Sequence, residues 1–201
     1  MIDRSTLAEI HRFWFGELKS PADMPPKETM DHWFGAKPEF DAEIKNRFEQ
    51  YLKPAKAKEW NLGELSRIEQ VGLIILLDQF PRNIYRTTHH AYDYDQKALA
   101  TAKALLANGV GIFYPVERVF VTLPFMHAEN IVEQDRSMLY TAAALNGVPE
   151  AMREGPRRGM DFAFKHWDIV KKFGRFPHRN VMMGRDSTPE EIEFLKNGRG
   201  F

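Results

Sequence analysis

The segment over residues 68–80 most constrains what this chain can fold into, because it is apolar on nearly all sides. Its centre, residues 71–77, is the longest apolar run in the sequence. A helix that is apolar all round must be covered by other elements, so we predict that this segment is the central helix of a buried core. Ser66 and Glu69 form a capping-box pattern at its start, and we expect Pro81 to stop it.

The rest of the chain repeats the helical spacing. Pro38 suits a first helical turn, and apolar residues follow it at every fourth position: Phe40, Ile44, Phe48 and Leu52. We expect further helices over residues 95–107, 115–125, 127–145 and 156–173, and a short last helix that begins near residue 188. No strand-like alternation is sustained. The predicted fold is all-α, an array of antiparallel helices forming a single helical domain over residues 1–201.

Composition narrows the classes of partner and the compartment. Lysine plus arginine and aspartate plus glutamate each number 28, so no global charge attracts nucleic acid or an anionic membrane, and we expect neither as a partner. The absence of cysteine excludes disulfides and thiolate chemistry and fits a reducing compartment. The polar N-terminal segment is unlike a secretory signal, and the run at 71–77 is too short to span a bilayer. We therefore expect a cytoplasmic protein.

Three polar residues fall where the helical pattern predicts burial. On a helical wheel, Asp135 shares a face with Ile131 in the segment 127–145, and His166 lies in the apolar stripe of the segment 156–173. For His166 the favoured interpretation is a hydrogen-bonded core residue. A buried carboxylate costs several kcal/mol unless it is paired, so Asp135 needs a cation or several donors. Asp78 needs one too, because it lies in the last turn of the central helix, where the dipole is negative.

Candidate cations are concentrated in two similar motifs. Phe80-Pro81-Arg82-Asn83 followed by Arg86 is echoed by Phe176-Pro177-His178-Arg179-Asn180 followed by Arg185. The echo indicates either duplicated helical hairpins or two similar helix ends. Residues 175–185 hold three arginines and a histidine but no acid, which is a local excess of positive charge. These arginines either neutralise Asp78, Asp95, Glu129 and Asp135, or leave part of the cluster open to an anionic ligand.

Motifs of the common cofactor sites are missing from the sequence. It contains no P-loop, no glycine-rich dinucleotide fingerprint and no Gly-x-Ser-x-Gly elbow. His127-Ala128-Glu129 offers two metal-ligand types, but residues two apart on a helix do not share a face. We therefore predict neither a cofactor nor a metal site.

Several strings of residues, in order along nearly the whole chain, carry a family resemblance. They include Phe13-Trp14-Phe15-Gly16, Leu77-Asp78-Gln79-Phe80-Pro81-Arg82-Asn83, Pro124-x-x-His127-x-Glu129 and Phe173-Gly174-Arg175-Phe176-Pro177-His178-Arg179-Asn180. The chain resembles domain-of-unknown-function family 924, which is mainly bacterial. The resemblance implies a fold similar to tetratricopeptide-like arrays and no established activity. Its pattern falls on the following polar positions: Asp78, Arg82, Asn83, Arg86, His127, Glu129, Gln134, Arg175, His178, Arg179, Asn180 and Arg185.

These positions support one leading hypothesis and two rivals. In the first, the ten positions other than His127 and Glu129 form a ligand-binding pocket for a small anion, and His127 and Glu129 transfer a proton if the protein is an enzyme. In the second, the chain is a tetratricopeptide-like module that binds a peptide in a groove, and the arginine–carboxylate network is structural. In the third, the cluster is wholly internal and another surface acts. The oligomeric state is not predicted.

Overall fold

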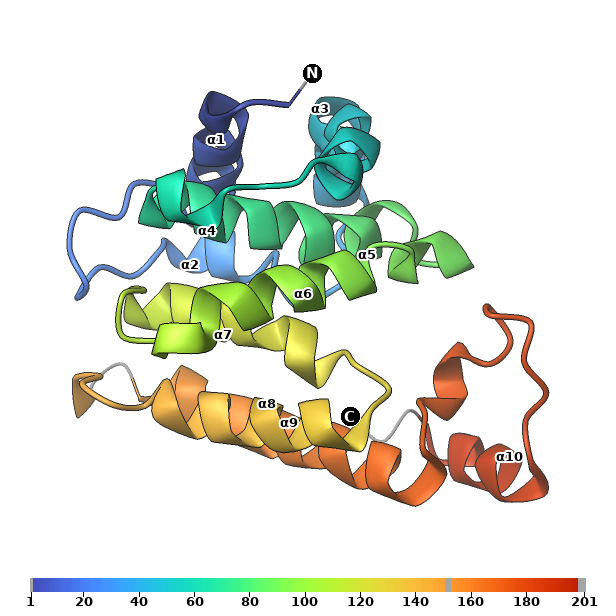
Figure 1. Ribbon diagram of the computed structural model, residues 1–201. Helices are drawn as coiled ribbons and strands as arrows, with labels where there is room; N and C mark the ends of the chain where they lie inside the picture. The colour runs from blue at the N-terminus through green and yellow to red at the C-terminus, as the bar shows by residue number, and fades with distance from the viewer. Residues whose placement is uncertain (1, 151–152, 199–201) are drawn as a thin grey trace.

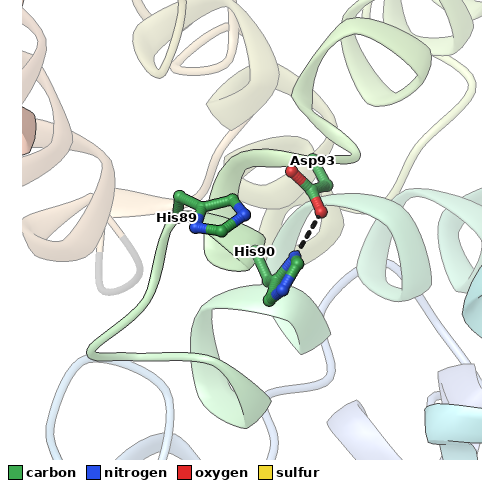
Figure 2. A group of neighbouring side chains, drawn as sticks. All are labelled: His89, His90 and Asp93. Atoms are coloured by element: carbon green, nitrogen blue, oxygen red, sulfur yellow. Dashed lines mark hydrogen bonds and ion pairs between the residues drawn. The ribbon is translucent and has the colours of Figure 1, made fainter. Parts of the chain in front are cut away.

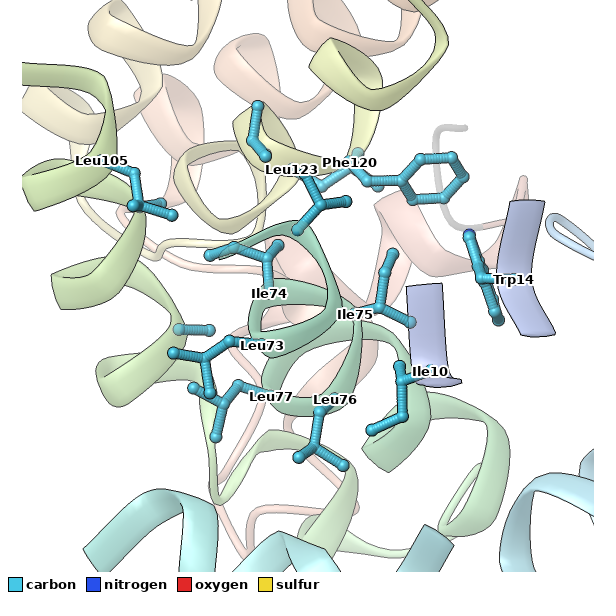
Figure 3. Close-up of a cluster of buried hydrophobic side chains, with 14 of the residues drawn as sticks. Ile10, Trp14, Leu73, Ile74, Ile75, Leu76, Leu77, Leu105, Phe120 and Leu123 are labelled. Carbon is cyan, nitrogen blue, oxygen red and sulfur yellow. The ribbon is translucent and has the colours of Figure 1, made fainter. Parts of the chain in front are cut away.

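The central helix is α4 (Arg67–Ile74), which continues through a π-helical turn (Ile75–Gln79) into α5 (Phe80–Ile84). The computed structural model describes residues 2–150 and 153–198, and within it every residue from 71 to 80 is buried. Side chains from helices before and after α4 in the chain surround this segment, including Ile10, Trp14, Leu105, Phe120 and Leu123 (Figure 3). The capping box of Ser66 and Glu69 is present at the start of α4. The expected burial of this segment is confirmed.

Pro81 does not stop the helix, contrary to the sequence prediction. The backbone N–H of Phe80 donates to the carbonyl of Ile75, five residues earlier, and α5 then runs on to Ile84. The wider π-helical turn places Pro81 at the first turn of α5, where its missing N–H costs no hydrogen bond. Consequently Asp78, Arg82 and Asn83 all lie on one continuous helical segment.

The helices are stacked in layers that follow the chain order (Figure 1). In the described residues, α1 and α3 cover α4 and α5 on one side, α6 and α7 lie on the other, and α8 and α9 pack against α7. The longer helices have these bounds: α1 Arg4–Phe15, α3 Pro38–Ala57, α6 Asp95–Leu105, α7 Pro115–Met126, α8 Ile131–Ala143 and α9 Glu154–Phe173. Short helices complete the fold: α2 Lys27–Met30, η3 His89–Tyr92, η6 Pro177–Arg179 and α10 Pro189–Lys196. The all-helical class is confirmed, and the finer tetratricopeptide-like arrangement stays a prediction.

The helix expected over residues 127–145 begins four residues later, with Asn130 as the N-cap of α8. His127 therefore lies in the connection between α7 and α8. The predicted buried face is also wrong, because Ile131 and Asp135 are exposed. The buried face of α8 instead carries residues that make hydrogen bonds or have small side chains: Glu133, Gln134, Ser137 and Thr141. Asp135 accepts a hydrogen bond from the indole of Trp167 on α9 and needs no buried cation.

The C-terminal part of the chain has a small core of its own. Ile169 and Val170 of α9 and Phe176 of the following loop form a separate buried cluster. His166 of α9 is buried as predicted, and its Nδ1 donates a hydrogen bond to the carbonyl of Phe162 at 2.7 Å. Among the described helices, none combines the length and the apolar character that crossing a bilayer requires.

Candidate functional site

The two echoed motifs meet at Asp95, the first residue of α6. Arg82 of α5 contacts both carboxylate oxygens of Asp95, with N···O distances of 2.9 and 3.0 Å. Arg179 of η6 approaches the same carboxylate from the other motif, at 3.6 Å. Two guanidinium groups that are 97 residues apart in the sequence therefore share one carboxylate. We call Asp78, Arg82, Asp95, His127 and Arg179 the Asp95 cluster.

Asp78 holds the imidazole of His127. The Asp78 side chain is fully buried; its Oδ1 lies 2.8 Å from His127 Nδ1, and its Oδ2 accepts from the Gln79 amide at 2.6 Å. Burial by itself would raise the pKa of Asp78, but the electrostatic attraction of His127 and Arg82 and the hydrogen bonds from His127 and Gln79 outweigh it and lower the pKa to about 2. The ionised carboxylate makes His127 Nδ1 the donor, which leaves Nε2 as the basic nitrogen of the ring.

His127 is poised as a neutral base rather than as a cation. Burial and the positive charge of Arg82 lower its pKa below the ordinary value of 6.5, and the attraction of Asp78 opposes this only in part. Only 15% of its side chain is exposed, and an Asp–His pair of this geometry is a common arrangement for general acid–base catalysis.

Arg179 lacks the partners that a buried arginine normally has. The residue is 6% exposed; its buried Nε has no hydrogen-bond partner among the described residues, and its Nη1 lies 3.6 Å from the Asp95 carboxylate. It stacks between the rings of Tyr92 and Phe176, each 4.5 Å from the guanidinium carbon. Burial and the nearby charge of Arg82 lower its pKa, against the attraction of Asp95. A buried N–H group without an acceptor is costly unless something else accepts its hydrogen bond.

Glu129, predicted to join His127 in proton transfer, has a different set of partners. Its two oxygens lie 2.5 and 2.9 Å from the guanidinium of Arg185, and Oε1 also accepts from the backbone N–H of Phe176 at 2.8 Å. Burial would raise its pKa, but these hydrogen bonds and the nearby arginines hold the pKa below its usual range. The pairing ties the second motif to the α7–α8 connection, and Asp78 rather than Glu129 is the carboxylate beside His127.

Asn83 and Arg86 of the first motif turn toward the start of α3. Asn83 donates to Asp41 at 2.8 Å, and Arg86 forms a two-point ion pair with Asp41 and donates to the carbonyl of Gly35 at 2.9 Å. These contacts fasten α5 to the first turn of α3. They leave neither side chain in contact with the Asp95 cluster.

Arg175 and Asn180 of the second motif turn toward α10. Arg175 forms a two-point ion pair with Glu191 at 2.7 and 2.8 Å, and Asn180 donates to the same carboxylate at 3.2 Å. Glu191 also caps α10 through the backbone N–H of Thr188. The two motifs thus share a plan, in which an arginine reaches Asp95 and the following asparagine binds an acid at the start of another helix.

The remaining predicted residues lie beside the cluster. Gln134 donates to the carbonyls of Met126 and Ala128 at 2.8 and 2.7 Å and so braces the connection that carries His127. His178 is half-buried on η6, with its ring 5.7 Å from that of Phe176.

Sequence reasoning missed two members of the site. The sequence patterns indicate Asp95 only as a counter-ion for the arginines, although the site is organised around it. They do not indicate Tyr92, which packs on Arg179. Tyr92 also lines a groove of about 550 Å³, together with His89, Asp93 and residues 181–184. The sequence feature that indicates these two residues is Tyr92-Asp93-Tyr94-Asp95, in which two aromatic rings and two acids alternate at the start of an alanine-rich helix.

Comparisons with known proteins place the chain in a family without a known activity. The model of a family described as bacterial protein of unknown function (DUF924) matches residues 10–199. A solved structure of a protein of unknown function from Agrobacterium tumefaciens is 34% identical, with a TM-score of 0.79, and the match covers 98% of this chain and all of that one. No curated protein matches the chain.

Proposed function

The chain belongs to the DUF924 family of bacterial proteins of unknown function, and since this membership carries no activity, we propose from the geometry that the Asp95 cluster binds a small anion. The observation that carries the proposal is Arg179, a buried guanidinium whose Nε has no hydrogen-bond partner among the described residues and whose contact with Asp95 is long, at 3.6 Å. A phosphate or carboxylate would supply the acceptors, because the planar guanidinium fork binds both in a two-point manner.

The charges around Arg179 support an anion rather than a neutral ligand. Arg82 pairs with Asp95 and also lies 3.6 Å from Asp78, whereas Arg179 has only the 3.6 Å contact with Asp95, which Arg82 approaches more closely. The site is also partly open to solvent, since the side chains of Arg82, Asp95 and His127 keep exposures of 19%, 17% and 15%. An incoming anion would relieve the repulsion between the two guanidinium groups.

The proposal extends to chemistry through His127. The Nδ1–H group of His127 donates a hydrogen bond to Asp78. The neutral ring therefore presents Nε2 as an acceptor that can take a proton from the bound molecule. The class of activity that fits is acid–base catalysis on an anionic substrate, and binding without turnover would make the protein an anion receptor.

Replacement of Arg179 by methionine tests the proposal. We expect the unmodified protein to bind inorganic phosphate or acetate at pH 7, and Arg179→Met to bind at least about tenfold more weakly, because charge-assisted hydrogen bonds contribute about 1.5–3 kcal/mol. Thermal stability should change little, since methionine can keep the packing between Tyr92 and Phe176 and the substitution removes a buried charge whose contact with Asp95 is long. Isothermal titration calorimetry and thermal melting measure the two effects.

Arg175→Met is the matched control, because Arg175 lies in the same loop but is already paired with Glu191. It should lower the melting temperature and leave anion affinity unchanged. A purely structural cluster would give the opposite result, with no anion bound by the unmodified protein and a large loss of stability in Arg179→Met.

A further inference from the structure

Three potential metal ligands lie together on the short helix η3 and its C-cap residue, outside the Asp95 cluster. His89, His90 and Asp93 each offer one ligand atom, and these three atoms all lie within 4.8 Å of one another. His90 Nδ1 is 2.7 Å from the carboxylate of Asp93, and the two imidazole rings are 4.0 Å apart between centroids. Figure 2 shows the ring of His89 extending toward the other two side chains.

The chemistry of this set points to one class of ion. Two imidazoles and one carboxylate are the ligands that Zn²⁺ and the neighbouring transition metals prefer, whereas Mg²⁺ and Ca²⁺ prefer sites made of oxygen atoms. Three protein ligands also leave at least one coordination position for water or for a bound molecule, as in catalytic zinc sites.

The surroundings of the three residues supply the second observation. His89 and Asp93 line the groove of about 550 Å³, whose opposite wall is formed by Val181, Met182, Met183 and Gly184. A ligand bound in this groove would therefore contact two of the three metal ligands. Tyr92 lines the same groove and also packs on Arg179, so one side chain contacts both the groove and the Asp95 cluster.

We infer that His89, His90 and Asp93 form a binding site for a divalent transition metal, with the open coordination position available to an oxygen ligand in the groove. Ligand atoms around tetrahedral Zn²⁺ lie about 3.3 Å apart, as follows from bonds of about 2.0–2.1 Å. The side chains must therefore move slightly, and because all three are exposed they can do so by rotation. The site does not depend on anion binding at the Asp95 cluster.

Titration of the full chain with Zn²⁺ tests this inference. The protein should carry no affinity tag, because a polyhistidine tag would bind the metal itself, and it should first be freed of metal with a chelator. We expect one Zn²⁺ per chain by calorimetry and a rise in melting temperature with Zn²⁺ concentration. Co²⁺ should give visible absorption bands typical of low coordination number, and millimolar Mg²⁺ should not compete.

Variants of the three residues separate this site from adventitious binding. His90→Gln and Asp93→Asn should each weaken Zn²⁺ binding at least tenfold, and both should fold normally because the side chains are exposed. His32→Gln, which changes a histidine outside the set, should leave binding unchanged. If the unmodified protein binds no Zn²⁺ at micromolar concentration, or if His90→Gln and Asp93→Asn bind it as well as the unmodified protein does, the inference is wrong.

Discussion

At the scale of single residues, the site is governed by how each charge is paired. Asp78 is fully buried, and the burial of its charge is tolerated only because His127, Gln79 and Arg82 surround it. Arg179 is also buried, but its Nε has no hydrogen-bond partner in the described residues. This contrast is the reason that we propose Arg179, and not Asp78, as the residue that binds a ligand.

Asp78→Asn should test the role of the buried carboxylate. The amide keeps an acceptor for His127 Nδ1–H but removes the charge that faces Arg82, so we expect a loss of about 2–4 kcal/mol in the free energy of unfolding. The pKa of His127 should fall further, because Asp78 is the main group that raises it. Urea denaturation measures the first effect, and NMR titration of the imidazole resonances measures the second. An unchanged His127 titration would mean that the two side chains are not paired in solution.

At the scale of helices, the crossing of α1 over α4 requires a glycine. A Cβ atom on Gly72 would lie 2.0 Å from the carbonyl oxygen of Leu7, which is backbone and cannot move aside. This close approach brings α1 onto the buried helix and lets Trp14 and Ile10 reach the core.

Gly72→Ala should therefore destabilise the protein by at least about 2 kcal/mol, because the two helices must separate. Gly159→Ala in α9 is the matched control, since its Cβ would make only an ordinary contact of 3.6 Å with Thr141. That variant should be neutral or stabilising by up to about 1 kcal/mol through helix propensity. Chemical denaturation of the two variants distinguishes tight packing from the general cost of replacing a glycine.

At the scale of the whole molecule, stability should fall in acid. Burial lowers the pKa of His166 to about 3, helped by the charges of His127, Arg179 and His178 and opposed by the hydrogen bond to Phe162. The unfolded chain, in which histidine has a pKa near 6.5, therefore binds a proton that the folded chain does not. The free energy of unfolding should decrease by about 1.4 kcal/mol per pH unit from this residue alone as the pH falls from 6.5 toward 3.

Urea denaturation between pH 4 and pH 7 measures this slope. His166→Gln removes the titrating group, so its stability should depend less on pH even if its stability at pH 7 is lower. His127 contributes in the same direction, because its folded pKa is also lowered. Equal slopes for the variant and the unmodified protein would show that His166 is not buried as a neutral ring.

By itself, the sequence determined the helical class and the buried central helix. The apolar residues at positions 71–77 lie on every side of that helix, so it must be buried whichever elements surround it. It also marked Asp78, Arg82 and Arg179 as polar residues to be explained. Only the tertiary structure decided their partners. Helix periodicity sets which side of a helix a residue faces but not which distant segment packs there. How the helices pack together therefore decided three features: the meeting of Arg82 and Arg179 at Asp95, the continuation of the helix past Pro81 and the exposure of Asp135.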